Sequence, residues 1–532
     1  MMGRRRFAPK LYYQLSLDQL IPTDHLLRHI AETIDFTFIY PLARPYYSHT
    51  GQPSVDPIII FKTLLIGYLY GITSERRLMA EIQVNLAYRW FLGYDLDEPI
   101  PDHSVLSKAR ARFGMEVFER FFQQSIEMCR EAGLLSEGPV YVDTTLVQAA
   151  ASMDSLVKRD EIIKPPLSIQ EYVRRLYTEN GPPQEGEPSI SPPPSPERST
   201  SDTVVPPRYR KVRPDGHRRK ANNELVSRTD PEATVVSRRG FDLHLAYKAH
   251  VAVSGRTGQV ITAAVATSGA KADEHLLGEM LSYHNRLTGL PVREVVADAK
   301  YGTIANYISL HNAGMTAFIP PRQRILGPRG IWGKDRFRYL EEEDIFLCPA
   351  GIPMKRFANR ASTHRVSYRV EKGACVGCQF REWCTPSGKN RTISRFFDQK
   401  LVDEAKGRLS SLLGQELIKQ RKVRVEGVFA LAKELHGLRR TRFMGRWRVQ
   451  IQLWLMAAAM NIKRALRGLR KMGALANGTR ATILNSLADA TKVIAAGIQS
   501  IFFRLRHHFS NSPSINGTHL GQERGINDKE GE

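Results

Sequence analysis

The chain lacks the features of a membrane-spanning or exported protein. Its longest apolar run, 454–460, is too short to cross a bilayer and is followed by Asn461 and Lys463. Residues 1–6 are basic but are not followed by an apolar segment, so we expect no signal peptide. Cysteine is also scarce, with five in 532 residues. We therefore expect a cytoplasmic, nucleoid-associated protein with reduced thiols.

The chain has fewer acidic than basic residues. Lys and Arg number 77 against 54 Asp and Glu, which gives a formal net charge of +23. Such an excess indicates a polyanionic partner. Nucleic acid is the favoured interpretation, because neutralising phosphates releases counterions; a membrane surface is the competing one. The apolar content of 42% is enough for more than one hydrophobic core.

Three acids stand out against this basic background. Asp143 and Asp298 follow short β-branched runs typical of buried strands, and Glu426 lies in a long basic helical pattern. A carboxylate at the end of a buried strand is costly unless a cation compensates it. Together the three predict a shared site for Mg²⁺ (or Mn²⁺), with a phosphodiester as substrate. Taken singly, each has an ordinary alternative as a turn residue, helix cap or ion-pair partner.

Composition and periodicity divide the chain into six parts. We predict a helical DNA-binding domain at 1–135 and a mixed α/β core at 136–153 and 231–335, with strands at 140–148, 245–253 and 258–267 and another ending at Asp298. The Pro- and Ser-rich segment 154–230 is predicted to be a disordered linker. Its basic stretch, 208–220, is interpreted as a DNA-gripping arm or as a solubilising linker. Residues 336–395 carry clustered cysteines, 396–470 are helical and include Glu426, and 471–532 form a helix and a disordered tail.

The clustered cysteines predict a structural metal site. Cys375 and Cys378 form a C-x₂-C pair, with Cys384 and Cys348 nearby in the sequence. This set is typical of a closed tetrahedral Zn²⁺ site. The alternative is four reduced thiols without a ligand.

Basic residues accompany Glu426 along its predicted helix. At 3.6 residues per turn, Lys419, Lys422, Glu426 and Lys433 fall on one stripe. Cations on that stripe would keep the carboxylate ionised and would meet phosphates on either side of a cleaved bond. Ordinary stabilising pairs along the helix explain the spacing almost as well.

Several motifs together resemble the DDE transposases of bacterial insertion sequences. The resemblance covers most of 15–468 apart from the linker. Its motifs are Gly-Gln-Pro-Ser-Val-Asp-Pro at 51–57, Pro-Asp-His-Ser at 101–104, Tyr-Val-Asp-Thr-Thr at 141–145, Ala-Asp-Ala-Lys-Tyr-Gly at 297–302 and Val-Glu-Gly-Val-Phe at 425–429. It implies an RNase H-like mixed sheet flanked by helices, an N-terminal all-α domain and a small zinc-binding insertion. Family members carry Tyr, Arg, Glu and Lys along the last helix; here Lys419 replaces the Tyr and Lys422 stands for the Arg.

The resemblance also implies an activity. Asp143, Asp298 and Glu426 would bind the Mg²⁺ ions used to cleave the ends of the element and join them to target DNA. Phosphate contacts would come from Lys300, Arg421, Lys422 and Lys433. The partners would be the terminal inverted repeats, the target DNA and a second copy of the chain in a homodimer. Two other functions stay open: an inactive transposase-derived DNA-binding protein, and an RNase H-like nuclease that does not join strands.

Overall fold

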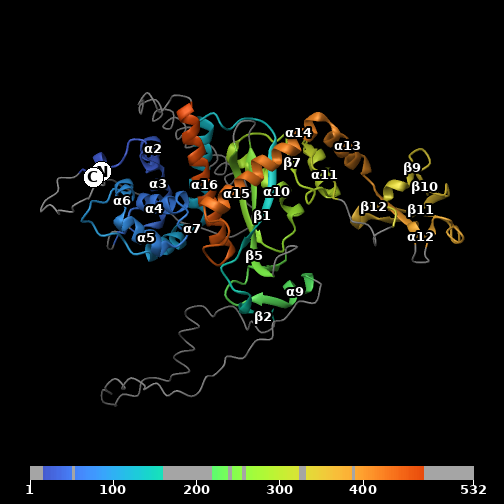
Figure 1. Ribbon diagram of the computed structural model, residues 1–532, viewed down its shortest axis with the longest axis horizontal. Helices are drawn as coiled ribbons and strands as arrows, with labels where there is room; N and C mark the ends of the chain where they lie inside the picture. Colours follow the sequence, from blue (N-terminus) through green and yellow to red (C-terminus); the bar gives the residue numbers. More distant parts are fainter. Residues whose placement is uncertain are drawn as a thin grey trace, which may run out of the picture.

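The computed structural model describes residues 16–48, 50, 54–159, 218–237, 243–254, 259–322, 331–385 and 390–471. A helical N-terminal part, a central mixed sheet and a separate β-rich lobe follow one another along the long axis (Figure 1). The predicted mixed α/β class with a helical N-terminal region is thereby confirmed. None of the described helices combines the length and apolarity that crossing a bilayer requires. The predicted tail at 471–532 lies outside the described residues, apart from the last residue of one helix.

The N-terminal part is built from helices with buried apolar sides. Asp56 caps the start of one of them: its carboxylate accepts a hydrogen bond from the Ile58 amide, and Pro57 occupies the first turn. Phe61 on this helix packs in the core against Phe113, Phe118 and Phe121. The main helices are α1 (Leu17–Leu20), α2 (Leu26–Thr33), α3 (Ile39–Ala43), α4 (Pro57–Leu69), α5 (Glu75–Val84), α6 (Leu86–Leu92) and α7 (Ser104–Glu131).

The central sheet has six strands, and its first strand in the chain lies in the middle. β1 (Val140–Gln148) pairs antiparallel with β5 (His244–Ser254) on one side and parallel with β7 (Glu294–Ala297) on the other. β7 continues in parallel to β8 (Thr316–Phe318). The far edge of β5 pairs with β6 (Val260–Ser268) and, at its start, with β4 (Thr234–Val236). The strands predicted at 140–148, 245–253 and 258–267 are thus confirmed within two residues at each end.

Helices cover the sheet and close its edge. α10 (Leu277–Thr288) packs on β5 and β6, and α11 (Ile304–Asn312) follows β7 and packs against β8. α16 (Arg446–Lys471) lies between the sheet and the N-terminal helices (Figure 1). Its buried Gln450 bonds to the Ala266 amide and its buried Asn461 to the Ile261 amide, which satisfies backbone groups of the edge strand β6.

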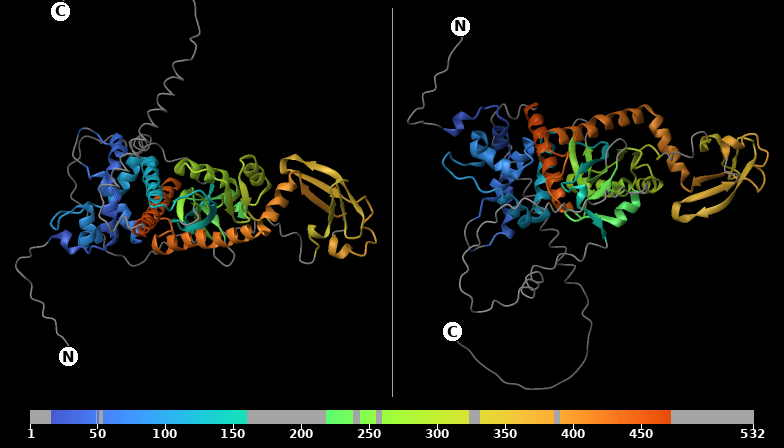
Figure 2. Two further views of the ribbon diagram at one scale, coloured as in Figure 1. Left: turned by 90° about the horizontal axis from the view of Figure 1, so that it is seen from above. Right: turned by 60° about the horizontal axis from the view of Figure 1, so that its bottom comes forward.

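The long helical pattern that carries Glu426 is divided in the structure. It consists of α13 (Gln399–Ser410), α14 (Leu412–Arg421), a π-helical turn η8 (Lys422–Glu426) and α15 (Gly427–Leu435). Ser411 separates the first two by leaving the helical conformation and capping α14 through Gly414. α14 and η8 pass over β7, β8 and β1, while α13 leads away to the β-rich lobe (Figure 2).

The cysteine-bearing segment, predicted at 336–395 without any strands, is rich in β-structure. It forms a five-stranded antiparallel sheet from β9 (Arg338–Leu340), β10 (Ile345–Leu347), β11 (Pro353–Arg360), β12 (Arg365–Arg369) and β13 (Thr392–Phe396), with the short helix α12 (Arg381–Cys384). Phe337, Phe346, Met354 and Tyr368 belong to a hydrophobic core separate from that of the rest of the protein. The segment is therefore a lobe with its own packing.

The ends of the predicted linker are structured. β2 (Leu156–Lys158) pairs with β3 (Leu225–Ser227), and α9 (Arg218–Glu224) precedes β3. The pairing brings both ends of the segment together beside the sheet. Residues 160–217, which include the Pro-rich runs and most of the basic stretch, lie outside the described residues.

Candidate active site

Two of the three predicted acids lie side by side because of strand register. Val142 on β1 is paired with Ala297, the last residue of the parallel strand β7, so the next residues are Asp143, within β1, and Asp298, directly after β7. Burial raises the pKa of the Asp143 carboxyl above its ordinary value, and the nearby charge of Asp298 acts in the same direction. The two carboxylates therefore repel each other in a partly desolvated position.

Arg421 connects the third acid to this pair. Its Nη1 lies 2.6 Å from Asp143 Oδ2 and its Nη2 lies 3.6 Å from Glu426 Oε1. The side chains of Arg421 and Asp143 are only 13% and 12% exposed, whereas that of Glu426 is 58% exposed. Asp143, Asp298 and Glu426 thus belong to one cluster, in which a guanidinium separates Glu426 from Asp143.

The π-helical turn explains why Arg421 takes this position. In η8 the helix widens, and residues five apart lie on the same side of it. Arg421, five residues before Glu426, therefore faces the carboxylates together with it. The predicted stripe assumed 3.6 residues per turn throughout, which would instead align Lys422 with Glu426; Lys422 is exposed. Lys433, seven residues after Glu426 on α15, is partly buried.

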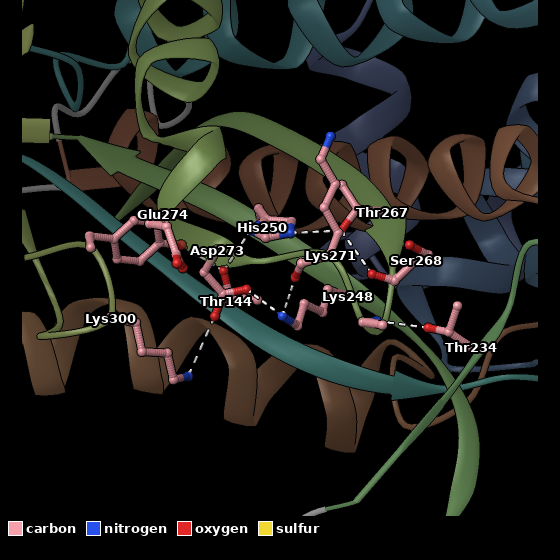
Figure 3. A network of polar contacts seen from close by, with 12 residues as sticks. Thr144, Thr234, Lys248, His250, Thr267, Ser268, Lys271, Asp273, Glu274 and Lys300 are labelled. Carbon is pink, nitrogen blue, oxygen red and sulfur yellow. Dashed lines mark hydrogen bonds and ion pairs between the residues drawn. The ribbon is translucent and has the colours of Figure 1, made fainter. Parts of the chain in front are cut away.

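Lys300 lies at the other end of the cluster. Its backbone amide donates to Asp298 Oδ1 at 2.9 Å, and its ammonium lies 3.7 Å from Asp298 Oδ2. The same ammonium is 3.6 Å from Asp273, an acid of the 3₁₀ turn that precedes α10. Figure 3 shows Lys300 and Lys248 both reaching toward Asp273. Of the four predicted phosphate contacts, Lys300 and Arg421 are in the cluster and hold its acids.

A network of hydrogen bonds between hydroxyl and imidazole groups lies next to the acid cluster. Thr144, next to Asp143, bonds through its hydroxyl to Tyr301 at 2.6 Å and to His250 at 2.6 Å. His250 is fully buried and also bonds to Thr267 (Figure 3). Burial lowers the pKa of His250 to about 4, so the imidazole is neutral at neutral pH. These hydrogen bonds connect β1 to β5, β6 and the turn after Asp298.

The donor set suits a hard divalent cation. Carboxylate oxygens are the ligands that Mg²⁺ and Mn²⁺ prefer, and a cation would relieve the repulsion between Asp143 and Asp298. In the described part of the chain, however, no three His, Cys, Asp or Glu side chains are placed closely enough to form a metal-binding group. At the acid cluster, Arg421 and Lys300 supply positive charge to the carboxylates instead.

The four clustered cysteines line one cavity of the β-rich lobe. Cys348, Cys375, Cys378 and Cys384 share it with Arg381 and Arg391. Burial raises the pKa of the Cys384 thiol, and the other three cysteines act in the same direction. The fold thus brings together thiols that are up to 36 residues apart in the sequence, although their side chains do not form a metal-binding group as placed.

Two protein families match separate parts of the chain. A transposase domain matches residues 15–112, and a transposase DDE domain matches residues 347–466. The second match includes Glu426 and the four clustered cysteines but not Asp143 or Asp298. Both matched families are transposase families, the second of the DDE type, in agreement with the resemblance that the motifs indicated.

The other comparisons add little. No curated protein matches the chain. A solved structure of the piggyBac transposase synaptic complex with hairpin DNA aligns with 93% of this chain and 86% of that chain, at 10% sequence identity and a TM-score of 0.34. A likeness this distant does not bear on the site.

Proposed function

We propose that the protein cleaves the ends of an insertion sequence and joins them to target DNA, with Asp143, Asp298 and Glu426 as the divalent metal ligands. The observation that carries this proposal is the in-register position of Asp143 and Asp298, linked to Glu426 through Arg421. An RNase H-like core is supported by the strand order β6-β5-β1-β7-β8, with three antiparallel strands followed by two parallel ones.

The chain's own residues would hold the reactants. Bound Mg²⁺ would activate the attacking hydroxyl and stabilise the leaving oxygen of the phosphodiester. Lys300, exposed at the rim of the site, would contact a phosphate, as would Lys422 and Lys433 along the helix. The remaining excess of positive charge would bind the terminal repeats and the target non-specifically. Two ends must be paired for transposition, so we propose a homodimer.

The test uses purified protein and a plasmid that carries the two element ends. With Mg²⁺, wild-type protein should nick the ends and join the 3′-hydroxyl to target DNA. Asp143→Asn, Asp298→Asn and Glu426→Gln should each abolish cleavage while the circular dichroism spectrum is retained. In the absence of metal, the three variants should bind DNA at least as tightly as wild type, because each removes a negative charge. Glu416→Gln, an exposed acid on α14, is the matched control and should cleave normally.

Each possible result selects one function. Nicking without joining by the wild-type protein would favour a nuclease, and DNA binding without any cleavage would favour an inactive transposase derivative. Normal nicking by Glu426→Gln would show that the third ligand is misassigned.

We also propose a structural Zn²⁺ held by Cys348, Cys375, Cys378 and Cys384. The shared cavity and the separate core of the lobe support this site. Elemental analysis should find one zinc per chain, and Cys375→Ser with Cys378→Ser should remove it and lower the stability of the lobe. Cys129→Ala, a change in the core of the N-terminal helices, should leave the zinc content intact. Equal zinc content in all variants would refute the site.

A further inference from the structure

Asp273 is a buried acid beside the site that the metal-binding trio does not include. It is the first residue of a 3₁₀ turn, a position where a side chain that caps the turn would face solvent. The side chain of Asp273 is instead only 5% exposed. It accepts no capping hydrogen bond, since the residue at the cap position is Ala272. A buried carboxylate needs a compensating charge, and two lysines supply it.

The two oxygens of Asp273 are used differently. Oδ1 pairs with Lys248 at 2.7 Å, and that ammonium also donates to the carbonyl of Lys271. Oδ2 faces Lys300 at 3.6 Å. Lys248 extends from β5 and is itself largely buried, so this half of the arrangement is fixed by the sheet (Figure 3). Lys300, 60% exposed, comes from the loop that carries Asp298.

Lys300 is therefore shared between two acids at nearly equal distances, 3.6 Å to Asp273 and 3.7 Å to Asp298. An ammonium paired with Asp298 alone would compete with a metal ion for that carboxylate. An ammonium drawn partly toward Asp273 competes less. The geometry thus connects Asp273 to the metal site through one exposed cation.

We propose that Asp273 is a positioning residue: by sharing the Lys300 ammonium with Asp298, it leaves the Asp298 carboxylate available to a divalent cation. This inference rests on the proposed function, because it concerns the same metal site. It assigns Asp273 no contact with the metal or with DNA.

The test is a Mn²⁺ titration of the full chain without DNA, with free Mn²⁺ followed by electron paramagnetic resonance. In Asp273→Asn, Lys300 pairs with Asp298 alone, so the Kd for Mn²⁺ should rise roughly two- to fivefold, the range that an exposed ion pair can supply. Lys300→Gln removes the competitor and should lower the Kd. In the double variant the Kd should equal that of Lys300→Gln, because Asp273 acts only through Lys300.

A purely structural role would give a different pattern. Asp273→Asn would then change the Kd by the same factor with or without Lys300, and that result, or an unchanged Kd in Asp273→Asn, would overturn the inference. Glu371→Gln, whose exposed ion pair with Lys355 lies in the β-rich lobe, is the control and should bind Mn²⁺ as wild type does.

An unfolded variant, an absent metal site and a wrong role for Asp273 give different results. If Asp273→Asn unfolds because Lys248 loses its anion, Lys248→Gln combined with Asp273→Asn removes both buried charges and carries the same expectation. If wild-type protein binds no Mn²⁺, the proposed metal site fails and this inference fails with it. If wild type binds Mn²⁺ and the variants follow no such pattern, only the role of Asp273 is refuted.

Discussion

The ion pair between Arg421 and Asp143 gives the site a measurable electrostatic signature. Replacing Arg421 by Met keeps an unbranched, largely aliphatic side chain and removes the guanidinium and its charge. Breaking a buried ion pair by deleting one partner costs about 3–5 kcal/mol, and the slight exposure of both side chains places this one near the lower end, about 3 kcal/mol. We expect that loss in the free energy of unfolding, measured by urea titration at neutral pH with a chelator present.

The pH dependence identifies the cause. Burial raises the pKa of Asp143, so its contribution to stability is complete below the ordinary carboxyl pKa and is lost as pH rises through the raised value. Without Arg421 the pKa should rise further, and the loss should be larger. The difference between Arg421→Met and wild type should therefore be small at about pH 4 and larger at about pH 8.

Metal supplies the second signature. Saturating Mg²⁺ should shrink the difference at neutral pH, because a bound cation would compensate Asp143 in place of the guanidinium. Lys422→Met, an exposed residue of the same π-helical turn, should change stability by less than about 0.5 kcal/mol and serves as the control. If Arg421→Met loses the same free energy of unfolding at both pH values and Mg²⁺ does not change that loss, the electrostatic explanation is refuted. Lost packing would then be the remaining explanation.

Two further changes test the surroundings of the acids. A Cβ on Gly302 would lie 2.0 Å from the carbonyl oxygen of Pro320, so Gly302→Ala should displace the loop after Asp298 and reduce cleavage and thermal stability. A Cβ on Gly278 would meet open space, so Gly278→Ala should change neither property. Equal behaviour of the two variants would contradict this packing. His250 should destabilise the protein as pH falls from about 6.5 toward its lowered pKa of about 4, by about 3 kcal/mol at the lower limit. Because two other buried histidines titrate in the same window, His250→Gln should remove roughly a third of the acid sensitivity seen in urea titrations, and an unchanged slope would count against a neutral buried imidazole.

The central sheet was largely predictable because its strands are regular. The strands around Asp143 and His250 are nine and eleven residues long and consist mostly of apolar and β-branched residues, so local pattern and tertiary environment agree. The β-rich lobe was missed for the opposite reason. Two of its strands are only three residues long, and β11 carries several basic residues, so no alternating pattern stands out.

The site was predictable in its acids but not in its cations. β-branched runs indicated Asp143 and Asp298, although Asp143 lies within β1 and only Asp298 follows the end of a strand. The π-helical turn that directs Arg421 toward the acids has no signature in a regular 3.6-residue pattern. The partner of Asp273, Lys248, is 25 residues away in the sequence and is brought to it by the sheet, so only the folded structure shows this pair.

The arrangement of charge at the site suggests an order of events. Asp143, Asp273, Asp298 and Glu426 supply four negative charges, and Lys248, Lys300 and Arg421 supply three positive ones. In a chain of net charge +23, the acids among these groups outnumber the cations by one, so this cluster attracts a phosphate less than the basic surface does. Divalent cations would reverse the sign of the cluster. DNA would therefore be held first by the basic surface, and its phosphodiester would enter the acid cluster only together with metal.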